Sequence, residues 1–318
     1  MKIIKNDLFF SVIIPLYNKK NTVLRTIDSI LKQSYNNFEI IVVNDGSIDG
    51  GEKIVESIID PRITIINQKN AGVSFARNNG AKRAKYDYVT FLDADDTWMP
   101  NFLEEMCFLI NTYPDAGLYG ANNYYKYPHS PVFTEDLKGF FQGKEYGLIT
   151  NYFKVFAELK KSPFLISSSC VHIDLFKAVG GFKVGVKLTE DSDFWCRIAL
   201  THDIAYSIRP SSIYFLALIG CTHEIFTPED FEVTLTLENA LKNNEVKEEH
   251  IFFVKKLIAF QKLGHAKRAI LTNNKWFALK KLFNFDFLLF YPIDTIKFFI
   301  ICFVPHGIID YWKSKKYN

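Results

Sequence analysis

Three aspartates follow directly on an apolar stretch near residue 90. Residues 88–92 predict a buried strand, and Asp93, Asp95 and Asp96 come at its end. On an extended backbone the side chains of Asp93 and Asp95 leave on the same side, so their charges repel each other unless a cation bridges them. Mg²⁺ and Mn²⁺ are commonly held by one or two carboxylates while substrate phosphates complete the shell. The pattern indicates a divalent cation and a phosphate-bearing substrate, and its alternative is a plain acidic turn.

The elements around these acids predict an α/β fold. Apolar runs rich in Ile and Val predict strands at residues 11–15, 38–43, 63–66, 88–92 and 117–120. Between them, apolar residues recur at helical spacing. This alternation is typical of a mostly parallel central sheet flanked by helices. Ligands bind beyond the carboxyl ends of such strands, so the loops after the first, second and fourth strands should form the site.

The later part of the chain predicts a second, different region. Residues 122–144 break the rhythm and suggest an irregular excursion, while 165–172 predict a strand, and 173–179 and 191–201 predict helices. From residue 231 onward the pattern is helical and rich in lysine. We expect a first domain over 1–230, with one half at about 1–120 and a second at about 121–230. A helical C-terminal extension over 231–318 should follow.

Composition excludes several classes of function. The 318 residues carry a net charge of +3 and no basic stripe interleaved with aromatics, so nucleic acid is not indicated. The five cysteines are scattered and never form a C-x-x-C pair, which indicates buried thiols rather than disulfides or a zinc site. Residues 1–7 lack the apolar core of a signal peptide. We therefore expect a cytoplasmic protein.

The C-terminal stretch from Trp276 to Tyr317 mixes large apolar side chains with lysines. No uncharged apolar run reaches the roughly 20 residues of a spanning helix. Aromatic residues beside lysines are typical of a segment that lies on an anionic membrane surface. The alternative is a C-terminal helix that packs on the domain. The pattern leaves both open.

Four ordered blocks carry a resemblance to a known family. The sequences are SVIIPLYN at 11–18, IVVNDGSID at 41–49, NAGVSFARNNG at 70–80 and LDADD at 92–96, extended by GGF at 180–182 and TEDSDFW at 189–195. Together they resemble the family 2 glycosyltransferases of GT-A fold, in particular those of bacterial surface polysaccharides. The resemblance implies an inverting transfer from a nucleotide-sugar, with UDP-sugars expected as donors. It also implies that Asp93 and Asp95 hold Mn²⁺ or Mg²⁺, with Asp95 the firmer ligand.

The resemblance implies that residues 1–230 form a catalytic domain, with a nucleotide-binding half at about 1–120 and an acceptor half at about 121–230. It assigns the nucleotide to the first two loops. It implies that Pro15 and Tyr17 line the base and that Asp45 accepts a hydrogen bond from it, whereas the alternative for Asp45 is an ordinary turn. Arg77, on a predicted helix, could reach a phosphate or form a salt bridge that holds the acidic loops, with Asp45 or Asp93 as its partner. Asp93 would also lie near the ribose and sugar.

The acceptor hydroxyl needs a base, because it is a poor nucleophile while it keeps its proton. Asp191 matches the family's base position at the start of a helix, and the neighbouring Glu190 should raise its pKa. The two acids could instead be favourable residues of a first helical turn.

Three further residues are weaker candidates. Asp96 could cap the helix after Pro100 or recognise the sugar. Trp98 could wall the acceptor side, although an aromatic next to such a loop often serves packing. His223 could contact a phosphate or metal, while a lone histidine is more often structural.

These expectations define a function and its rivals. We expect an inverting, metal-dependent hexosyl- or N-acetylhexosaminyltransferase that acts on a lipid-linked glycan in lipopolysaccharide or capsule synthesis, at the inner face of the cytoplasmic membrane. One rival transfers sugar to a polyprenyl phosphate, which is already ionised and needs no base. Another is a non-catalytic protein that binds nucleotide-sugars. A dinucleotide-binding dehydrogenase is disfavoured because no G-x-G-x-x-G follows the first strand.

Overall fold

The computed structural model describes residues 8–128, 130–134, 137–141, 143–216, 231–283, 285–309 and 311. The chain divides into two compact units. The first comprises Met1–Tyr152 and Ser162–Leu216, and the second comprises Phe153–Lys161 and Ala217–Asn318.

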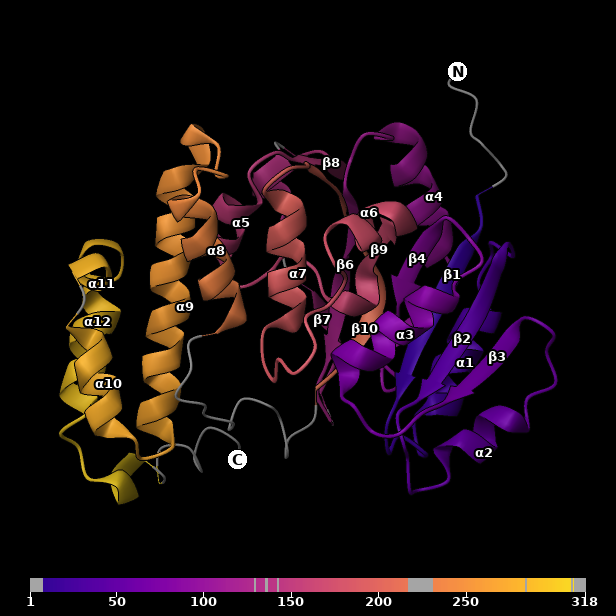
Figure 1. Cartoon of the computed structure of the whole chain (residues 1–318), viewed down its shortest axis with the longest axis horizontal. Helices are drawn as coiled ribbons and strands as arrows, with labels where there is room; N and C mark the ends of the chain where they lie inside the picture. Colours follow the sequence, from indigo (N-terminus) through magenta and orange to yellow (C-terminus); the bar gives the residue numbers. More distant parts are fainter. Residues whose placement is uncertain are drawn as a thin grey trace. The chain divides into compact units, whose positions relative to one another are not determined.

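Within the described residues, the first unit is built on a ten-stranded mixed sheet (Figure 1). Its strands are β1 (Phe10–Leu16), β2 (Phe38–Asn44), β3 (Ile63–Asn67), β4 (Tyr88–Phe91), β5 (Thr97–Trp98), β6 (Leu118–Lys126), β7 (Phe133–Thr134), β8 (Tyr146–Ile149), β9 (Ser169–His172) and β10 (Ile204–Phe215). The order is β3-β2-β1-β4-β9-β6-β10-β5, while β7 pairs with β6 and β8 with β10. Strands β3, β2, β1 and β4 are parallel, and β9 runs antiparallel between β4 and β6.

The helices before α8 are short and lie between these strands in the sequence; one of them, α5, belongs to the second unit from Phe153 onward. They are α1 (Val23–Leu31), α2 (Gly51–Glu56), α3 (Val73–Arg83), α4 (Phe102–Thr112), α5 (Tyr152–Leu159), α6 (Ile173–Ala178) and α7 (Glu190–Ala199). Strands β1 and β2 are almost continuously apolar because helices cover both of their faces.

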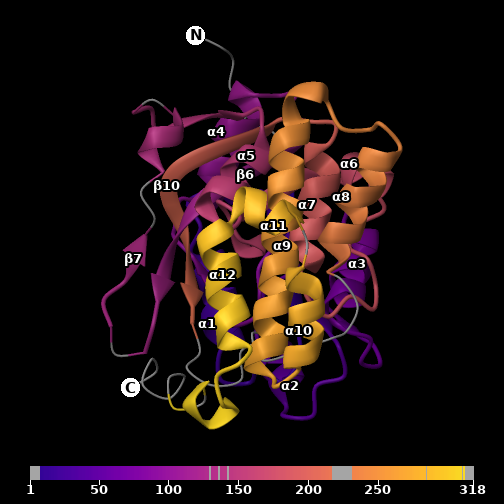
Figure 2. The same cartoon turned by 90° about the vertical axis from the view of Figure 1, so that its left-hand side faces the viewer.

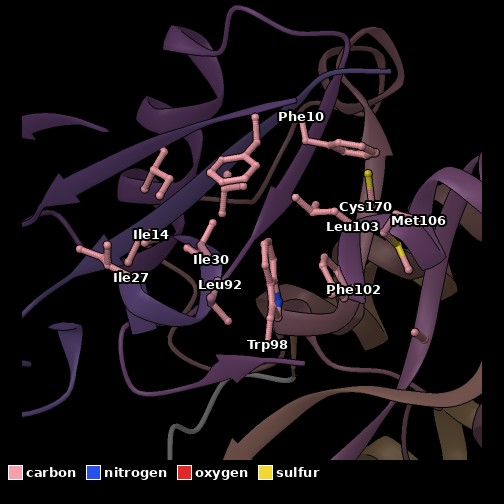
Figure 3. Close-up of a cluster of buried hydrophobic side chains, with 14 of the residues drawn as sticks. Phe10, Ile14, Ile27, Ile30, Leu92, Trp98, Phe102, Leu103, Met106 and Cys170 are labelled. Atoms are coloured by element: carbon pink, nitrogen blue, oxygen red, sulfur yellow. The ribbon is translucent and has the colours of Figure 1, made fainter. Parts of the chain in front are cut away.

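Alternate residues of β1 serve the two faces of the sheet. Ile14 packs in a cluster with Ile27 and Ile30 of α1 and with Phe102 of α4 (Figure 3). On the opposite face, α3 approaches the sheet so closely that Gly80 lies against Ile13, with no room for a side chain. This packing holds the carboxyl ends of β1, β2 and β4, and the loops that follow them, at one edge.

The predicted α/β fold is confirmed, with three local corrections. The strand expected at 117–120 continues to Lys126 because β6 pairs along its length with β10. Part of the excursion expected at 122–144 is therefore regular, with β7 and a 3₁₀ helix at Lys138–Phe141. Residues 165–172 form a 3₁₀ turn at Ile166–Ser168 before β9, since the serine side chains there hydrogen-bond locally and to the acidic loop.

The described part of the second unit from residue 231 onward is helical, as predicted (Figure 2). Its helices are α8 (Glu232–Lys242), α9 (Ile251–Leu271), α10 (Lys275–Leu282), α11 (Phe285–Phe290) and α12 (Pro292–Ile301). Small residues of α9 and α10, such as Ala266, Ala269 and Ala278, let these helices pack closely around Phe287 and Tyr291. Among the described residues, no helix is both long and apolar enough to cross a membrane.

Four of the five cysteines have free, buried thiols, as the scattered spacing predicts. They are Cys107, Cys170, Cys196 and Cys302. Cys221 lies outside the described residues.

Candidate functional site

Hydrogen bonds join the loops that follow β1 and β2 at the carboxyl edge of the sheet. The side-chain oxygen of Asn18 accepts from the backbone N–H of Ile48 at 2.9 Å, and Asp49 accepts from the N–H of Lys20 at 2.8 Å. Pro15 is the second-last residue of β1. Tyr17, the first residue after that strand, is exposed. The predicted base-binding residues therefore lie beside the loop that begins with Asp45.

Asp45 is buried and organises the turn before α3. Its carboxylate accepts hydrogen bonds from the Gln68 side chain and from the backbone N–H groups of Ala71 and Gly72, at 2.8 to 2.9 Å. Gly46 follows with φ +73°, and a Cβ there would lie 2.9 Å from the Asn70 backbone nitrogen, so only glycine fits. Three of the four hydrogen-bond acceptor positions of the Asp45 carboxylate are engaged. The fourth can accept a hydrogen bond from a ligand.

Ser167 forms hydrogen bonds that hold the acidic loop after β4 in place. The Ser167 hydroxyl accepts from the Asp93 N–H at 3.3 Å and donates to Asp96 at 2.6 Å, and its carbonyl accepts from the Trp98 indole N–H at 2.6 Å. Asp93 and Asp95 keep partial exposure, whereas Asp96 is buried. The loop therefore presents two of its three acids to solvent.

A lysine that the sequence analysis did not single out contacts this loop. Lys19, in the loop after β1, forms an ion pair with Asp95 through Oδ2. Arg25 of α1 donates to the Asp95 carbonyl at 2.7 Å. The signal available in the sequence was a cation two positions after Tyr17, in a loop at the same edge as the acids.

Arg77 bridges two groups of acids that are far apart in the sequence. Its Nη2 lies 2.7 Å from Asp93 Oδ1 and its Nη1 lies 3.1 Å from Glu190 Oε1, while its side chain is only 4% exposed. Burial alone disfavours the charge on Arg77, but the attraction of Asp93 and Glu190 outweighs it and raises the pKa of the guanidinium. Of the predicted partners, Asp93 is confirmed and Asp45 is not, and Glu190 is an additional one.

Asp191 lies beside this bridge at the start of α7. Burial raises the pKa of its carboxyl, the negative charge of Glu190 raises it further, and Arg77 opposes the rise without cancelling it. The predicted effect of Glu190 on Asp191 is thus confirmed in direction. A carboxylate with a raised pKa is a better proton acceptor near neutral pH than an ordinary one.

A glycine turn ties the two helices that carry Arg77 and Asp191. Asn78, next to Arg77 on α3, bonds both backbone groups of Phe182, at 2.6 and 2.9 Å. Arg197 of α7 donates to the Gly181 carbonyl at 2.7 Å and pairs with the fully buried Asp193 at 2.8 Å. The turn therefore couples the position of α3 to that of α7, a role the motif did not reveal.

The weaker candidates lie elsewhere than expected or outside the described residues. Asp96 does not cap α4, whose N-cap is Asn101; its carboxylate instead accepts from Ser167 and from the Phe215 N–H. Trp98 is 4% exposed and stacks on Phe102 in the core (Figure 3), which favours packing over a wall on the acceptor side. His223 lies outside the described residues.

The carboxylate oxygens of the acidic loop are suitable ligands for a hard divalent cation. Within the described part of the chain, no three His, Cys, Asp or Glu side chains gather as a complete metal site. The side-chain contacts with Arg77 and Lys19 engage Oδ1 of Asp93 and Oδ2 of Asp95, which leaves one carboxylate oxygen on each for a cation. Mg²⁺ and Mn²⁺ accept such a partial protein shell when a diphosphate supplies further oxygens.

Comparison with solved structures shows the fold. The chain is similar to Staphylococcus aureus TarS 1–349 in complex with UDP-GlcNAc, with a TM-score of 0.59 and 21% identity over 93% of this chain and 79% of that one. It is also similar to the mannosyltransferase PcManGT from Pyrobaculum calidifontis in complex with GDP-Man and Mn²⁺, with a TM-score of 0.58 and 16% identity over 95% and 88% of the two chains. The architecture is the GT-A fold that the resemblance implies.

Comparison of sequences shows the family. An uncharacterised glycosyltransferase of Rickettsia typhi, RT0329, is 32% identical over 74% of this chain and 69% of its own length. Glycosyltransferase GlyA of Streptococcus pneumoniae is 42% identical over 38% of this chain, and the matched part spans only 17% of GlyA. The amylovoran biosynthesis glycosyltransferase AmsB of Erwinia amylovora is 36% identical over 35% of this chain and 38% of its own length. Residues 11–171 match the family described as glycosyl transferase family 2, and the chain belongs to that family.

Proposed function

We propose that this chain is an inverting glycosyltransferase that moves a sugar from a UDP-sugar to a hydroxyl group of a glycan, with Asp191 as the base. The observation that carries the proposal is the pair of salt bridges from Arg77 to Asp93 and Glu190. They join the acidic loop after β4 to the start of α7, where Glu190 and Asp191 lie. The catalytic domain would cover residues 1–230, followed by the helical extension over 231–318.

The donor side would use residues from three loops. Pro15 and Tyr17 would line the uracil ring, and Asp45 would accept from its imide N–H through its remaining acceptor position. Asp93 and Asp95 would hold Mn²⁺ or Mg²⁺, which when bound neutralises negative charge on the diphosphate leaving group. Lys19, displaced from Asp95, would then be free to pair with a phosphate.

The acceptor side would use Asp191. Its carboxylate takes the hydroxyl proton while the acceptor oxygen bonds to the anomeric carbon and the bond to the nucleoside diphosphate breaks. This single displacement inverts the configuration and needs no covalent enzyme intermediate. The raised pKa of Asp191 supports the role of base, which transfer to an ionised polyprenyl phosphate would not require.

The substrate class rests on the relatives. AmsB is named for the biosynthesis of a polysaccharide, and the TarS structure holds UDP-GlcNAc. These names support a hexosyl- or N-acetylhexosaminyl donor and a cell-surface glycan acceptor. We propose that this acceptor is carried on a lipid, so that the enzyme works at the inner face of the cytoplasmic membrane.

Calorimetric titration with UDP and with GDP, each with and without Mn²⁺, tests the donor site. We expect UDP to bind more tightly when Mn²⁺ is present. Asp95→Asn should weaken that binding by at least about tenfold, because it removes a charged ligand of the cation. Asp115→Asn is the matched control, since Asp115 is an exposed acid before β6, at the other end of the sheet.

The outcomes separate the rivals. Absence of UDP binding under every condition would contradict the donor site. Binding of UDP without UDP release from any UDP-sugar, in the presence of glycan acceptors, would favour a non-catalytic binding protein.

A further inference from the structure

The C-terminal helix α12 exposes a row of large aliphatic side chains. Ile293, Ile296 and Ile300 are 80%, 54% and 59% exposed, and Phe303, just after the helix, is 67% exposed. Their spacing of three, four and three residues places them on one helical face. A folded unit gains nothing from leaving such a row in water.

The opposite face of α12 already supplies the contacts that the unit's core needs. Thr295 and Cys302 are buried, and Cys302 belongs to the cluster that includes Phe287 and Tyr291. The Thr295 hydroxyl donates to the Tyr291 carbonyl at 2.7 Å. The exposed row is therefore additional to the core and not part of it.

Exposed aromatic rings extend the row towards α10. Phe283, 79% exposed, packs edge-on against Phe299 with ring centroids 5.8 Å apart, and Phe299 packs against Phe303 at 5.5 Å. We call Ile293, Ile296, Phe299, Ile300, Phe303 and Phe283 the α12 face. It joins residues of two elements into one apolar surface.

The charge around the α12 face is positive. The described residues 275–283, 285–309 and 311 contain four lysines, two aspartates, and no arginine or glutamate, although the whole chain has a net charge of only +3. Lys280 and Lys297 are exposed, and Asp294 is paired with Lys160 at 3.0 Å, which reduces the local negative charge. An apolar face beside lysines matches the boundary between acyl chains and anionic headgroups.

We propose that the α12 face binds the surface of an anionic lipid membrane, with its isoleucines and phenylalanines inserted at the headgroup boundary and Lys280 and Lys297 among the headgroups. The helices lie on the membrane and do not cross it, consistent with the lack of a spanning helix in the described residues. This inference does not depend on the proposed sugar transfer, since lipid binding needs no donor or acceptor.

Co-sedimentation of the full chain with vesicles tests the proposal. One set of vesicles contains phosphatidylcholine alone and the other also contains phosphatidylglycerol. We expect clear preference for the anionic set. The double variant Ile296→Ser/Ile300→Ser should reduce partitioning by at least about tenfold, because it removes the apolar groups that insert. The double variant Lys280→Glu/Lys297→Glu should abolish the preference for phosphatidylglycerol.

Matched variants exclude a general effect of changing exposed residues. Ile59→Ser/Leu235→Ser removes exposed aliphatic side chains outside the α12 face, and Lys53→Glu/Lys82→Glu reverses exposed lysines of the first unit. Neither should alter vesicle binding. Thermal melting of each variant confirms that it is folded.

Three results would overturn the proposal: a wild-type chain that stays in the supernatant with anionic vesicles, an Ile296→Ser/Ile300→Ser variant that binds like its control, or a change in this variant's oligomeric state with vesicle binding intact. The last would identify the α12 face as a contact between copies. UDP titration of the same samples tells failure of lipid binding apart from failure of the proposed function.

Discussion

The two units depart in opposite directions from the usual sorting of polar and apolar side chains. The first buries charged residues, such as Arg77, Asp96 and Asp193, whereas the second exposes large apolar ones, such as Ile293 and Phe303. Both arrangements are unfavourable for a protein that only has to fold. We relate the buried charges of the first unit to the proposed sugar transfer, and the exposed row on α12 to the proposed membrane contact.

Replacing Asp191 by Asn should have the largest effect on the first unit's chemistry. An amide cannot take the acceptor's proton, so kcat should fall by roughly 10²- to 10⁴-fold while UDP affinity stays close to that of the wild type. The measurement is UDP release from UDP-sugars with glycan acceptors. Glu190→Gln is the comparison and should retain more activity. An Asp191→Asn variant with full activity would favour transfer to a polyprenyl phosphate.

The pH profile should report the same carboxyl. In the proposed mechanism Asp191 acts as a base only when deprotonated, and burial together with Glu190 raises its pKa to about 6. We expect kcat/KM to fall about tenfold per pH unit below that value and to level off above it. Glu190→Gln should move the acidic limb to lower pH because it removes a neighbouring negative charge. A limb near pH 4 in the wild type would contradict the assignment.

Replacing Arg77 tests how much the buried salt bridges contribute to stability. In Arg77→Gln, Asp93 and Glu190 lose their partner while remaining partly buried, and we expect the free energy of unfolding to fall by about 3 kcal/mol. Urea denaturation with an unchanged m-value measures this. The double variant Arg77→Gln/Glu190→Gln should recover part of the loss. A loss below about 1 kcal/mol would mean that water screens the bridge.

The sequence predicted the strands of residues 1–120 well, for a physical reason. Strands β1 and β2 are buried on both faces, so their Ile and Val runs are unbroken and flanked by polar loops. The order of these strands brings Asp45 and Asp93 to one edge of the sheet, as expected. The acids of the loop after β4 and the pair Glu190 and Asp191 could likewise be predicted as candidates, because they are carboxylates at the end of a predicted strand and near the start of a predicted helix.

What the sequence could not predict depends on contacts between distant segments. Ser167 lies 71 residues from Asp96, and nothing local shows that it fixes the acidic loop. The residues next to Trp98 in the sequence would be the same whether its side chain faced a ligand or the core. Its stacking on Phe102 shows that it faces the core. The sequence also did not predict which face of α12 remains exposed, because apolar residues occur on every side of that helix, with Asp294 and Lys297 between them.

Two glycines, one in each unit, should give the smallest changes in stability when replaced by alanine. A Cβ at Gly80 of α3 would lie 2.4 Å from the Cγ2 of Ile13, so Gly80→Ala should destabilise the first unit by about 1–3 kcal/mol. No described heavy atom outside its own helix and chain neighbours lies within 4 Å of a Cβ at Gly264 of α9, so Gly264→Ala should stabilise the second unit by about 0.5–1 kcal/mol through helix propensity. Urea denaturation of both variants provides the measurement. Equal changes of the same sign would show that α3 is no more tightly packed than α9, and the close packing that we invoke to hold the site's loops in place would lose its support.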